Sequence, residues 1–172
     1  VQPRSSWNLF DTDVLRWLLN RKFSLDLLRQ FNQLRSAIEP EAAALAALLA
    51  DDNELAAINA GLERMKAAET GGEQILEADI AFHVAVLKGS KNPFFAQFQD
   101  VVATALRSSI QFTNRLKGHS ASIPDHAAVA HAIMKRQPEK ARAAMKKLVS
   151  DVLDLIDAAE PEKAGKAAAK RR

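Results

Sequence analysis

Apolar residues recur at three- and four-residue spacing along almost the whole chain, and this period predicts helices. No segment alternates apolar and polar residues over any length, so the pattern predicts no β-sheet. We therefore expect an all-α protein of six or seven helices. The predicted helices lie at residues 14–19, 25–50, 55–65, 77–88, 93–110, 123–135 and 138–156.

Capping and breaking residues set the expected ends of these helices. Residues 11–13 (Asp-Thr-Asp) and Ser24 are suited to N-caps, because their side-chain oxygens can accept hydrogen bonds from the first free backbone N–H groups. Pro40 should interrupt the second helix with a kink or break near Glu39, since the residue before a proline avoids the helical region. Pro93 is placed to open a single long helix from its first turn.

The helix around residues 77–87 carries the candidate chemistry. Apolar side chains cover most of its circumference, which is typical of a buried helix. Asp79 and His83 lie one helical turn apart within it, so both side chains leave the same face. A buried polar group without a partner costs roughly 1–3 kcal/mol. These two groups therefore require each other, water, a metal ion or a ligand as partners.

A third side chain could join this pair. His126 has apolar residues or alanine at helical spacing around it, so we expect it to face inward. Together Asp79, His83 and His126 would offer one carboxylate and two imidazoles, a ligand set that suits zinc, nickel, manganese or iron. The residues alone leave open a purely structural alternative, in which Asp79 and His83 form a hydrogen bond in the core.

Two arginines are also placed where charge is unexpected. Arg35 and Arg107 stand on otherwise apolar helical faces. Each guanidinium could extend to water, pair with a carboxylate such as Glu39 or Asp79, or bind an anionic ligand through two hydrogen bonds. The sequence alone does not choose among these roles.

Composition narrows the class of protein. The chain has 172 residues, of which 48% are hydrophobic, enough for one domain with a sizeable core. It has no cysteine, which excludes disulfides and thiolate metal ligands. No apolar run approaches the roughly 20 residues that span a bilayer. These features fit a cytoplasmic location.

The charge is unevenly distributed along the chain. The formal net charge is +3, and residues 162–172 alone contribute +4 through five basic residues and one acidic residue. The remainder is thus close to neutral at −1. We expect the basic residues to belong to a disordered tail at 159–172 rather than to a DNA-binding surface of the folded part.

Five motifs, in order and at matching spacing, resemble the effector-binding C-terminal domain (the FCD domain) of FadR-subfamily GntR transcription regulators. They are residues 34–43 (LRSAIEPEAA), 77–83 (EADIAFH), 90–93 (SKNP), 125–133 (Asp-His followed by Ile133) and 141–145 (ARAAM). The resemblance covers roughly residues 11–157 and is greatest to regulators of sugar-acid catabolism, such as galactonate-responsive repressors. It implies a linker remnant at 1–10, a domain at 11–158 and a winged helix N-terminal to Val1.

The resemblance also implies a metal site. Asp79 and His83 match the first two ligands of the family, and His126 matches the third. The fourth ligand should fall at position 148, which is Leu148 here. Either three protein ligands hold a divalent ion with water or the effector completing its coordination, or the pocket is metal-free and binds its effector by hydrogen bonds and arginine.

The function that the resemblance implies is sensing rather than catalysis. An antiparallel bundle would enclose a central cavity for a small organic acid, with Arg35 and Arg107 matching arginines that reach toward the effector. The parent protein would bind DNA as a homodimer, and no catalytic residue is predicted. Two alternatives remain: a metal-dependent enzyme that acts on a small carboxylate through a water activated at Asp79, His83 and His126, or a helical dimerisation domain without a ligand.

Overall fold

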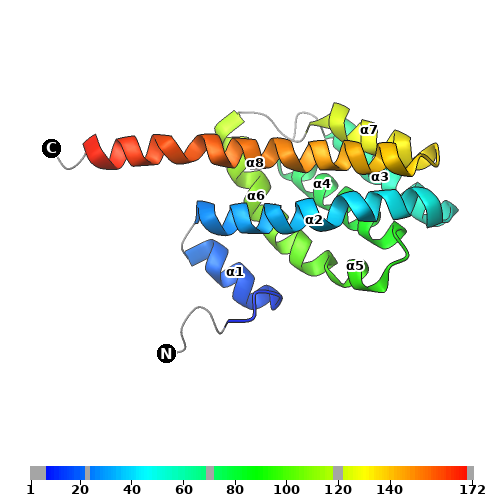
Figure 1. Ribbon diagram of the computed structural model, residues 1–172, viewed down its shortest axis with the longest axis horizontal. Coiled ribbons are helices and arrows are strands. Elements are labelled where there is room, and N and C mark those ends of the chain that lie inside the picture. The colour runs from blue at the N-terminus through cyan, green and yellow to red at the C-terminus, as the bar shows by residue number, and fades with distance from the viewer. Residues whose placement is uncertain (1–6, 22–23, 69–71, 118–121, 170–172) are drawn as a thin grey trace.

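The computed structural model describes the backbone of residues 7–21, 24–68, 72–117 and 122–169, with side chains in these ranges except at 20–21, 72–73, 110–117 and 160–169. Within these ranges the chain forms eight helices and no strand, which confirms the all-α prediction (Figure 1). The helices are α1 (Thr12–Arg21), α2 (Leu25–Leu49), α3 (Asp52–Ala67), α4 (Gly72–Gly89), α5 (Pro93–Gln97), α6 (Gln99–Lys117), α7 (Ile123–Met134) and α8 (Pro138–Ala169).

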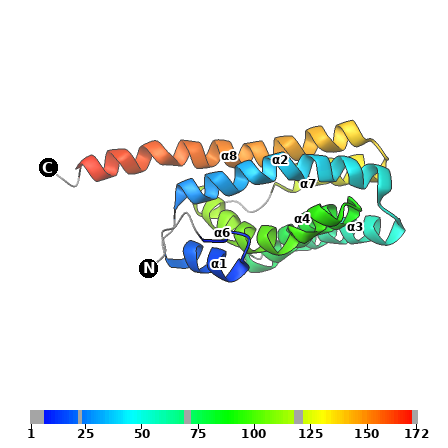
Figure 2. The same cartoon turned by 60° about the horizontal axis from the view of Figure 1, so that its bottom comes forward.

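The helices pack mainly in antiparallel pairs. Helices α2 and α8 run side by side in opposite directions in both views, and they form the most extensive helix–helix contact of the molecule (Figures 1 and 2). Helix α4 contacts α2, α3, α5 and α6, so it lies in the middle of the bundle. This position confirms the prediction that the helix carrying Asp79 and His83 is buried, and it directs both side chains into the interior.

Of the kink or break expected near Glu39, the break is absent from helix α2. It continues from Leu25 to Leu49 with Pro40 inside it, and both Glu39 and Pro40 are buried. A proline inside a helix costs roughly 3 kcal/mol relative to alanine. Buried alanines follow Pro40 in α2, and the long contact of α2 with α8 stabilises the continuous helix.

The single long helix predicted from Pro93 is also corrected. It divides into α5 and α6 at Phe98, whose N–H donates to the carbonyl of Phe95 at 3.1 Å. This tightened turn redirects the chain, and the Phe98 ring packs edge-on against Phe10 with 5.5 Å between ring centroids. The tertiary aromatic contact thus favours a break that the apolar period does not reveal.

The predicted caps are present. The Asp11 carboxylate accepts from the N–H groups of Asp13 and Val14 at the start of α1. Ser24 accepts from Leu27 N–H at the start of α2. These bonds satisfy backbone donors that a helix leaves free at its N-terminus.

The last helix is longer than predicted. Helix α8 runs to Ala169 and projects beyond the end of the bundle, whereas the expected domain ended at residue 158 (Figure 1). The expected linker lies partly outside the described residues, as does the end of the expected tail, so the division into linker, domain and tail stays a prediction. None of the helices in the described part of the chain is both long and apolar enough to cross a membrane.

Candidate functional site

Three of the predicted site residues meet in the interior of the bundle. Asp79 and His83 come from α4, and His126 comes from the first turns of α7. All three are buried, and each offers a ligand atom within 4.8 Å of the other two. Tertiary packing therefore brings together the residues that the sequence pattern singled out.

Hydrogen bonds fix how each imidazole is presented. His83 Nδ1 lies 2.7 Å from the Glu39 carboxylate, and His126 Nδ1 lies 2.8 Å from the Ser122 carbonyl oxygen. A carbonyl and an ionised carboxylate can only accept, so both Nδ1 atoms carry the proton and donate it. The two Nε2 atoms then point toward the same Asp79 oxygen, at 3.2 Å from His83 and 3.3 Å from His126.

A positive charge between the three groups would stabilise this arrangement. When both rings are neutral with Nδ1 protonated, each Nε2 carries a lone pair that faces the Asp79 oxygen, and the Arg35 guanidinium lies 3.2 Å from Nε2 of His83. A further ring proton or a metal ion would remove the repulsion. Two ligands about 2.0–2.1 Å from a tetrahedral zinc ion lie ~3.3 Å apart, close to the 3.2 and 3.3 Å found here. The three residues thus fit a divalent cation.

Aromatic packing restricts both imidazoles further. The Phe82 ring, fully buried, lies edge-on to His83 and to His126, with centroids 5.8 and 5.1 Å away. The two imidazoles lie edge-on to each other at 5.3 Å. Such contacts leave the rings little rotational freedom, which favours a preformed site.

A buried ion pair adjoins this cluster. Arg35 donates to both oxygens of Glu39, from Nε at 2.7 Å and from Nη2 at 3.2 Å. Its Nη1 donates to the Asn32 side-chain oxygen at 3.0 Å, and Asn32 donates in turn to Ser109 on α6 at 3.2 Å. Among the described residues, every buried side-chain nitrogen and oxygen has a partner.

The electrostatics follow from these contacts. Burial would raise the pKa of Glu39, but Arg35 and His83 outweigh it and lower that pKa from 4.5 to about 2. Burial likewise opposes ionisation of Asp79, yet the two histidines hold its pKa well below the usual range. Burial lowers and Glu39 raises the pKa of His83, with Arg35 opposing Glu39, and the net direction is upward. Both carboxylates are therefore ionised at neutral pH.

The two predicted arginines lie in different surroundings. Arg35 is buried, and its Nη2 lies 3.2 Å from His83 Nε2. Arg107 is 47% exposed and pairs with Glu77, which is 40% exposed. A ligand-binding role for Arg107 stays a prediction. Leu148 is buried, as expected of an apolar residue at the position of the fourth ligand.

The polar network around the cluster is larger than the sequence predicts. The sequence pattern indicated Glu39 only as a partner for an arginine, and it gave no indication of Asn32 or Ser109, which are both fully or almost fully buried. One signal was available for the buried pair: Arg35 and Glu39 stand one helical turn apart on a largely apolar face. No comparable spacing in the sequence could predict the contacts that these residues make with other helices.

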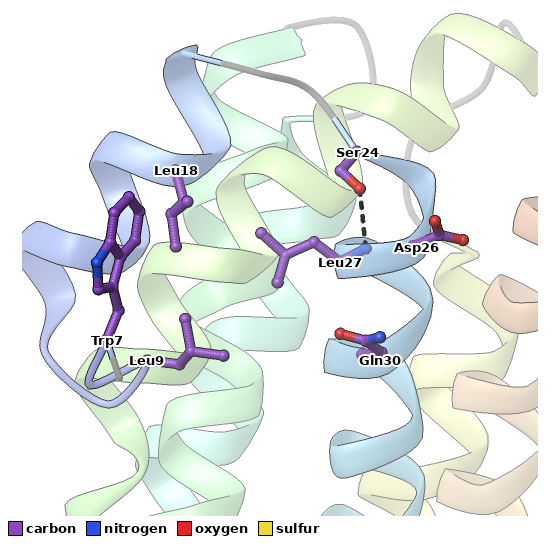
Figure 3. A pocket seen from close by; sticks show the side chains of 7 residues that line it. All are labelled: Trp7, Leu9, Leu18, Ser24, Asp26, Leu27 and Gln30. Atoms are coloured by element: carbon purple, nitrogen blue, oxygen red, sulfur yellow. Dashed lines mark hydrogen bonds between the residues drawn. The ribbon is translucent and has the colours of Figure 1, made fainter. Parts of the chain in front are cut away.

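A separate cleft of about 280 Å³ lies between the N-terminal segment, α1 and the start of α2 (Figure 3). It is lined by Trp7, Leu9, Leu18, Ser24, Asp26, Leu27 and Gln30. The Ser24 hydroxyl accepts from Leu27 N–H, and the Asp26 carboxylate pairs with Arg29, so these polar groups already have partners. We assign no chemistry to this cleft.

Solved structures share this fold. A Streptococcus agalactiae GntR protein superposes with a TM-score of 0.65 over 79% of this chain and 62% of its own, at 22% sequence identity. Escherichia coli McbR/YncC superposes with a TM-score of 0.65 over 78% of this chain and 70% of its own, at 18% identity. At these identities the likeness concerns the fold.

Sequence comparison identifies the relatives. The chain is 33% identical over 148 residues to the galactonate operon transcriptional repressor of E. coli K12, covering 84% of this chain and 64% of that protein. It is 26% identical over 151 residues to the HTH-type transcriptional regulator YieP of E. coli K12, covering 87% and 65%. The chain thus spans somewhat under two thirds of the length of these relatives, and both are transcription regulators rather than enzymes.

The FCD domain family matches residues 30–151, the segment from the second turn of α2 into α8 that contains Arg35, Glu39 and the Asp79–His83–His126 cluster. The predicted family is thereby confirmed, and with it the regulator class of the relatives. This chain belongs to the FCD domain family, the effector-binding domains of GntR-type transcription regulators.

Proposed function

We propose that this domain senses a small anionic metabolite, such as a sugar acid, beside a divalent metal ion held by Asp79, His83 and His126. The observation that carries the proposal is the convergence of the Nε2 atoms of His83 and His126 on one Asp79 oxygen, at 3.2 and 3.3 Å, with the three ligand atoms within 4.8 Å of one another. A cation there would remove the lone-pair repulsion and would supply an electrophilic position for a carboxylate or hydroxyl oxygen.

Two features support an acidic effector. The Arg35 guanidinium lies beside His83 Nε2, so one carboxylate could contact the metal and Arg35 together. Leu148 offers no ligand atom, which leaves coordination positions for the effector. A sugar acid is favoured over other acids because a curated relative is named for the galactonate operon.

The domain would act on DNA through a winged helix in the parent protein. Effector binding would favour one arrangement of the bundle and change the spacing of two DNA-binding heads in a homodimer, since paired half-sites need a two-fold axis. The size of this effect cannot exceed the difference between the effector's affinities for the two arrangements.

Thermal unfolding of the purified chain tests the proposal. We expect Zn²⁺, Ni²⁺ or Mn²⁺ to raise the Tm, D-galactonate to raise it further, and a chelator to reverse the metal effect. A ligand at 100 times its Kd contributes about 2.7 kcal/mol to the free energy of unfolding. If no metal and no acid from a panel of sugar acids and hydroxy acids shifts the Tm, the sensor proposal is wrong.

Two histidines on α7 provide matched variants. His126→Ala should abolish metal retention in equilibrium dialysis, because it removes one of three ligands. His131→Ala should leave retention unchanged, because His131 is exposed. Equal retention by both variants would place the metal elsewhere.

The enzyme alternative has a direct test. A site with three protein ligands and an open position is also the arrangement of many hydrolytic metal centres. The metal-loaded chain is incubated with the acids that stabilise it, and their concentrations are followed by chromatography. Stabilisation without consumption supports a sensor, and turnover would overturn that role.

A further inference from the structure

We propose that Glu39 is a positioning residue that fixes the tautomer and ring orientation of His83 for metal binding. The inference rests on the metal site of the proposed function, and it assigns the ion pair of α2 a role in that site. Glu39 is not itself a ligand, because it approaches Nδ1 of the ring whereas Nε2 faces Asp79.

The geometry is that of a carboxylate–histidine–metal arrangement. Glu39 Oε2 accepts the Nδ1 proton of His83 at 2.7 Å, which leaves the Nε2 lone pair aimed toward Asp79 and His126. A carboxylate in this position also makes Nε2 a more basic ligand. His126 is oriented by the neutral carbonyl of Ser122 instead, so His83 alone receives this charged support.

The carboxylate is itself held rigidly. Arg35 fixes both of its oxygens, and Asn32 holds Arg35 through Nη1 at 3.0 Å. Asn32 in turn donates to the carbonyl of Leu28 at 2.8 Å and to the hydroxyl of Ser109 at 3.2 Å. A chain of hydrogen bonds therefore runs from α6 through α2 to the ring of His83 on α4.

A simpler view would make Glu39 only the counter-ion of buried Arg35. That view accounts for the two bonds to Arg35 but not for the third contact, which is as short as the shorter of them. It predicts that replacing Glu39 changes stability without changing metal affinity in the folded protein. The two views can therefore be separated by measuring affinity.

The test compares Glu39→Gln with Glu41→Gln. Both substitutions remove one carboxylate charge from α2, but Glu41 is exposed and pairs with Arg142 of α8. Metal affinity is measured with Zn²⁺ in competition with a chromophoric chelator. We expect Glu39→Gln to weaken Zn²⁺ binding about 10- to 100-fold and Glu41→Gln to leave it within about twofold of the wild type. Equal affinities in all three proteins would overturn the inference.

A spectroscopic measurement gives an independent readout. Long-range ¹H–¹⁵N correlation of the imidazole rings in the metal-free protein reports which nitrogen of His83 carries the proton. At a pH above the raised pKa of His83, where the ring is neutral, we expect a single Nδ1–H form in the wild type and in Glu41→Gln. In Glu39→Gln the amide can either accept or donate, so a mixture of tautomers is expected. An unchanged Nδ1–H form would count against the inference.

Removal of Glu39 alone leaves Arg35 buried without its counter-ion, so the double variant Arg35→Met/Glu39→Gln is measured as well. It removes both charges at similar volume and should show the same loss of affinity. Failure of the wild type to bind any metal would refute the proposed metal site instead, while the tautomer measurement would still decide what Glu39 does to His83.

Discussion

At the scale of single residues, the interior of this domain gives each buried carboxylate one partner on its own helix and one on another helix. Glu39 meets Arg35 and His83, and Asp79 meets His83 and His126. An unpaired charge at these depths would cost several kcal/mol. The cluster is therefore stable only as a set, and its members respond together to pH and to metal.

Acid should destabilise the domain through Glu39. Its pKa is lowered to about 2 when folded, from an ordinary value of 4.5. A lowered pKa favours the folded state above pH 4.5, and this contribution, of the order of a few kcal/mol, is lost as the pH falls toward 2. Urea unfolding at pH 7 and pH 3 should show the loss. The Arg35→Met/Glu39→Gln variant should lose less stability over this interval, and an equal loss would show that Glu39 contributes little.

At the scale of helices, close approach of α3 and α4 positions the site. A Cβ at Gly61 on α3 would lie 2.9 Å from the Cα of Phe82 on α4. Phe82 packs against both imidazoles of the cluster. The absence of a side chain at Gly61 thus allows the short distance between α3 and α4. Through Phe82, it also affects the positions of the two imidazole rings.

Gly61→Ala should therefore be destabilising although alanine favours helices. The propensity gain is about 1 kcal/mol, but overpacking against backbone costs about 1–3 kcal/mol. We expect a net loss of about 1 kcal/mol in the free energy of unfolding by urea denaturation, together with weaker metal binding. Asn59→Ala, at an exposed position of the same helix, should be neutral or slightly stabilising. A stabilised Gly61→Ala variant would mean that α3 and α4 can move apart to accommodate the methyl group without loss of free energy of unfolding.

At the scale of the whole molecule, the site joins helices that are distant in sequence. Its groups come from α2, α4 and α7, and the long pairing of α2 with α8 crosses the entire bundle. A ligand that draws these helices together would act on the full length of the domain.

Metal and effector should bind cooperatively if they share the site. By linkage, the factor by which metal strengthens effector binding equals the factor by which effector strengthens metal binding. Calorimetric titration of D-galactonate with and without Zn²⁺, and of Zn²⁺ with and without D-galactonate, measures both factors. We expect equal factors above about fivefold, the lower end of usual coupling. Two factors near one would place effector and metal in independent sites.

Much of the fold follows from the sequence because helical periodicity is local. The period showed that α4 is apolar on most sides, and the spacing of Asp79 and His83 placed both side chains on one face of it. The apolar residues around His126 likewise predicted that its side chain faces inward. Helix α2 shows the limit of such reasoning, because Pro40 predicted a kink or break, whereas the helix continues through Pro40 and packs along α8.

Only the tertiary structure decided which groups meet. A helix fixes the face from which a side chain leaves, whereas its partner depends on how neighbouring helices slide and rotate against one another. The sequence could not show that Glu39 would reach His83, or that Arg35 would be enclosed while Arg107 stays near solvent. The residues of the cluster were determined by sequence, and their contacts were determined by packing.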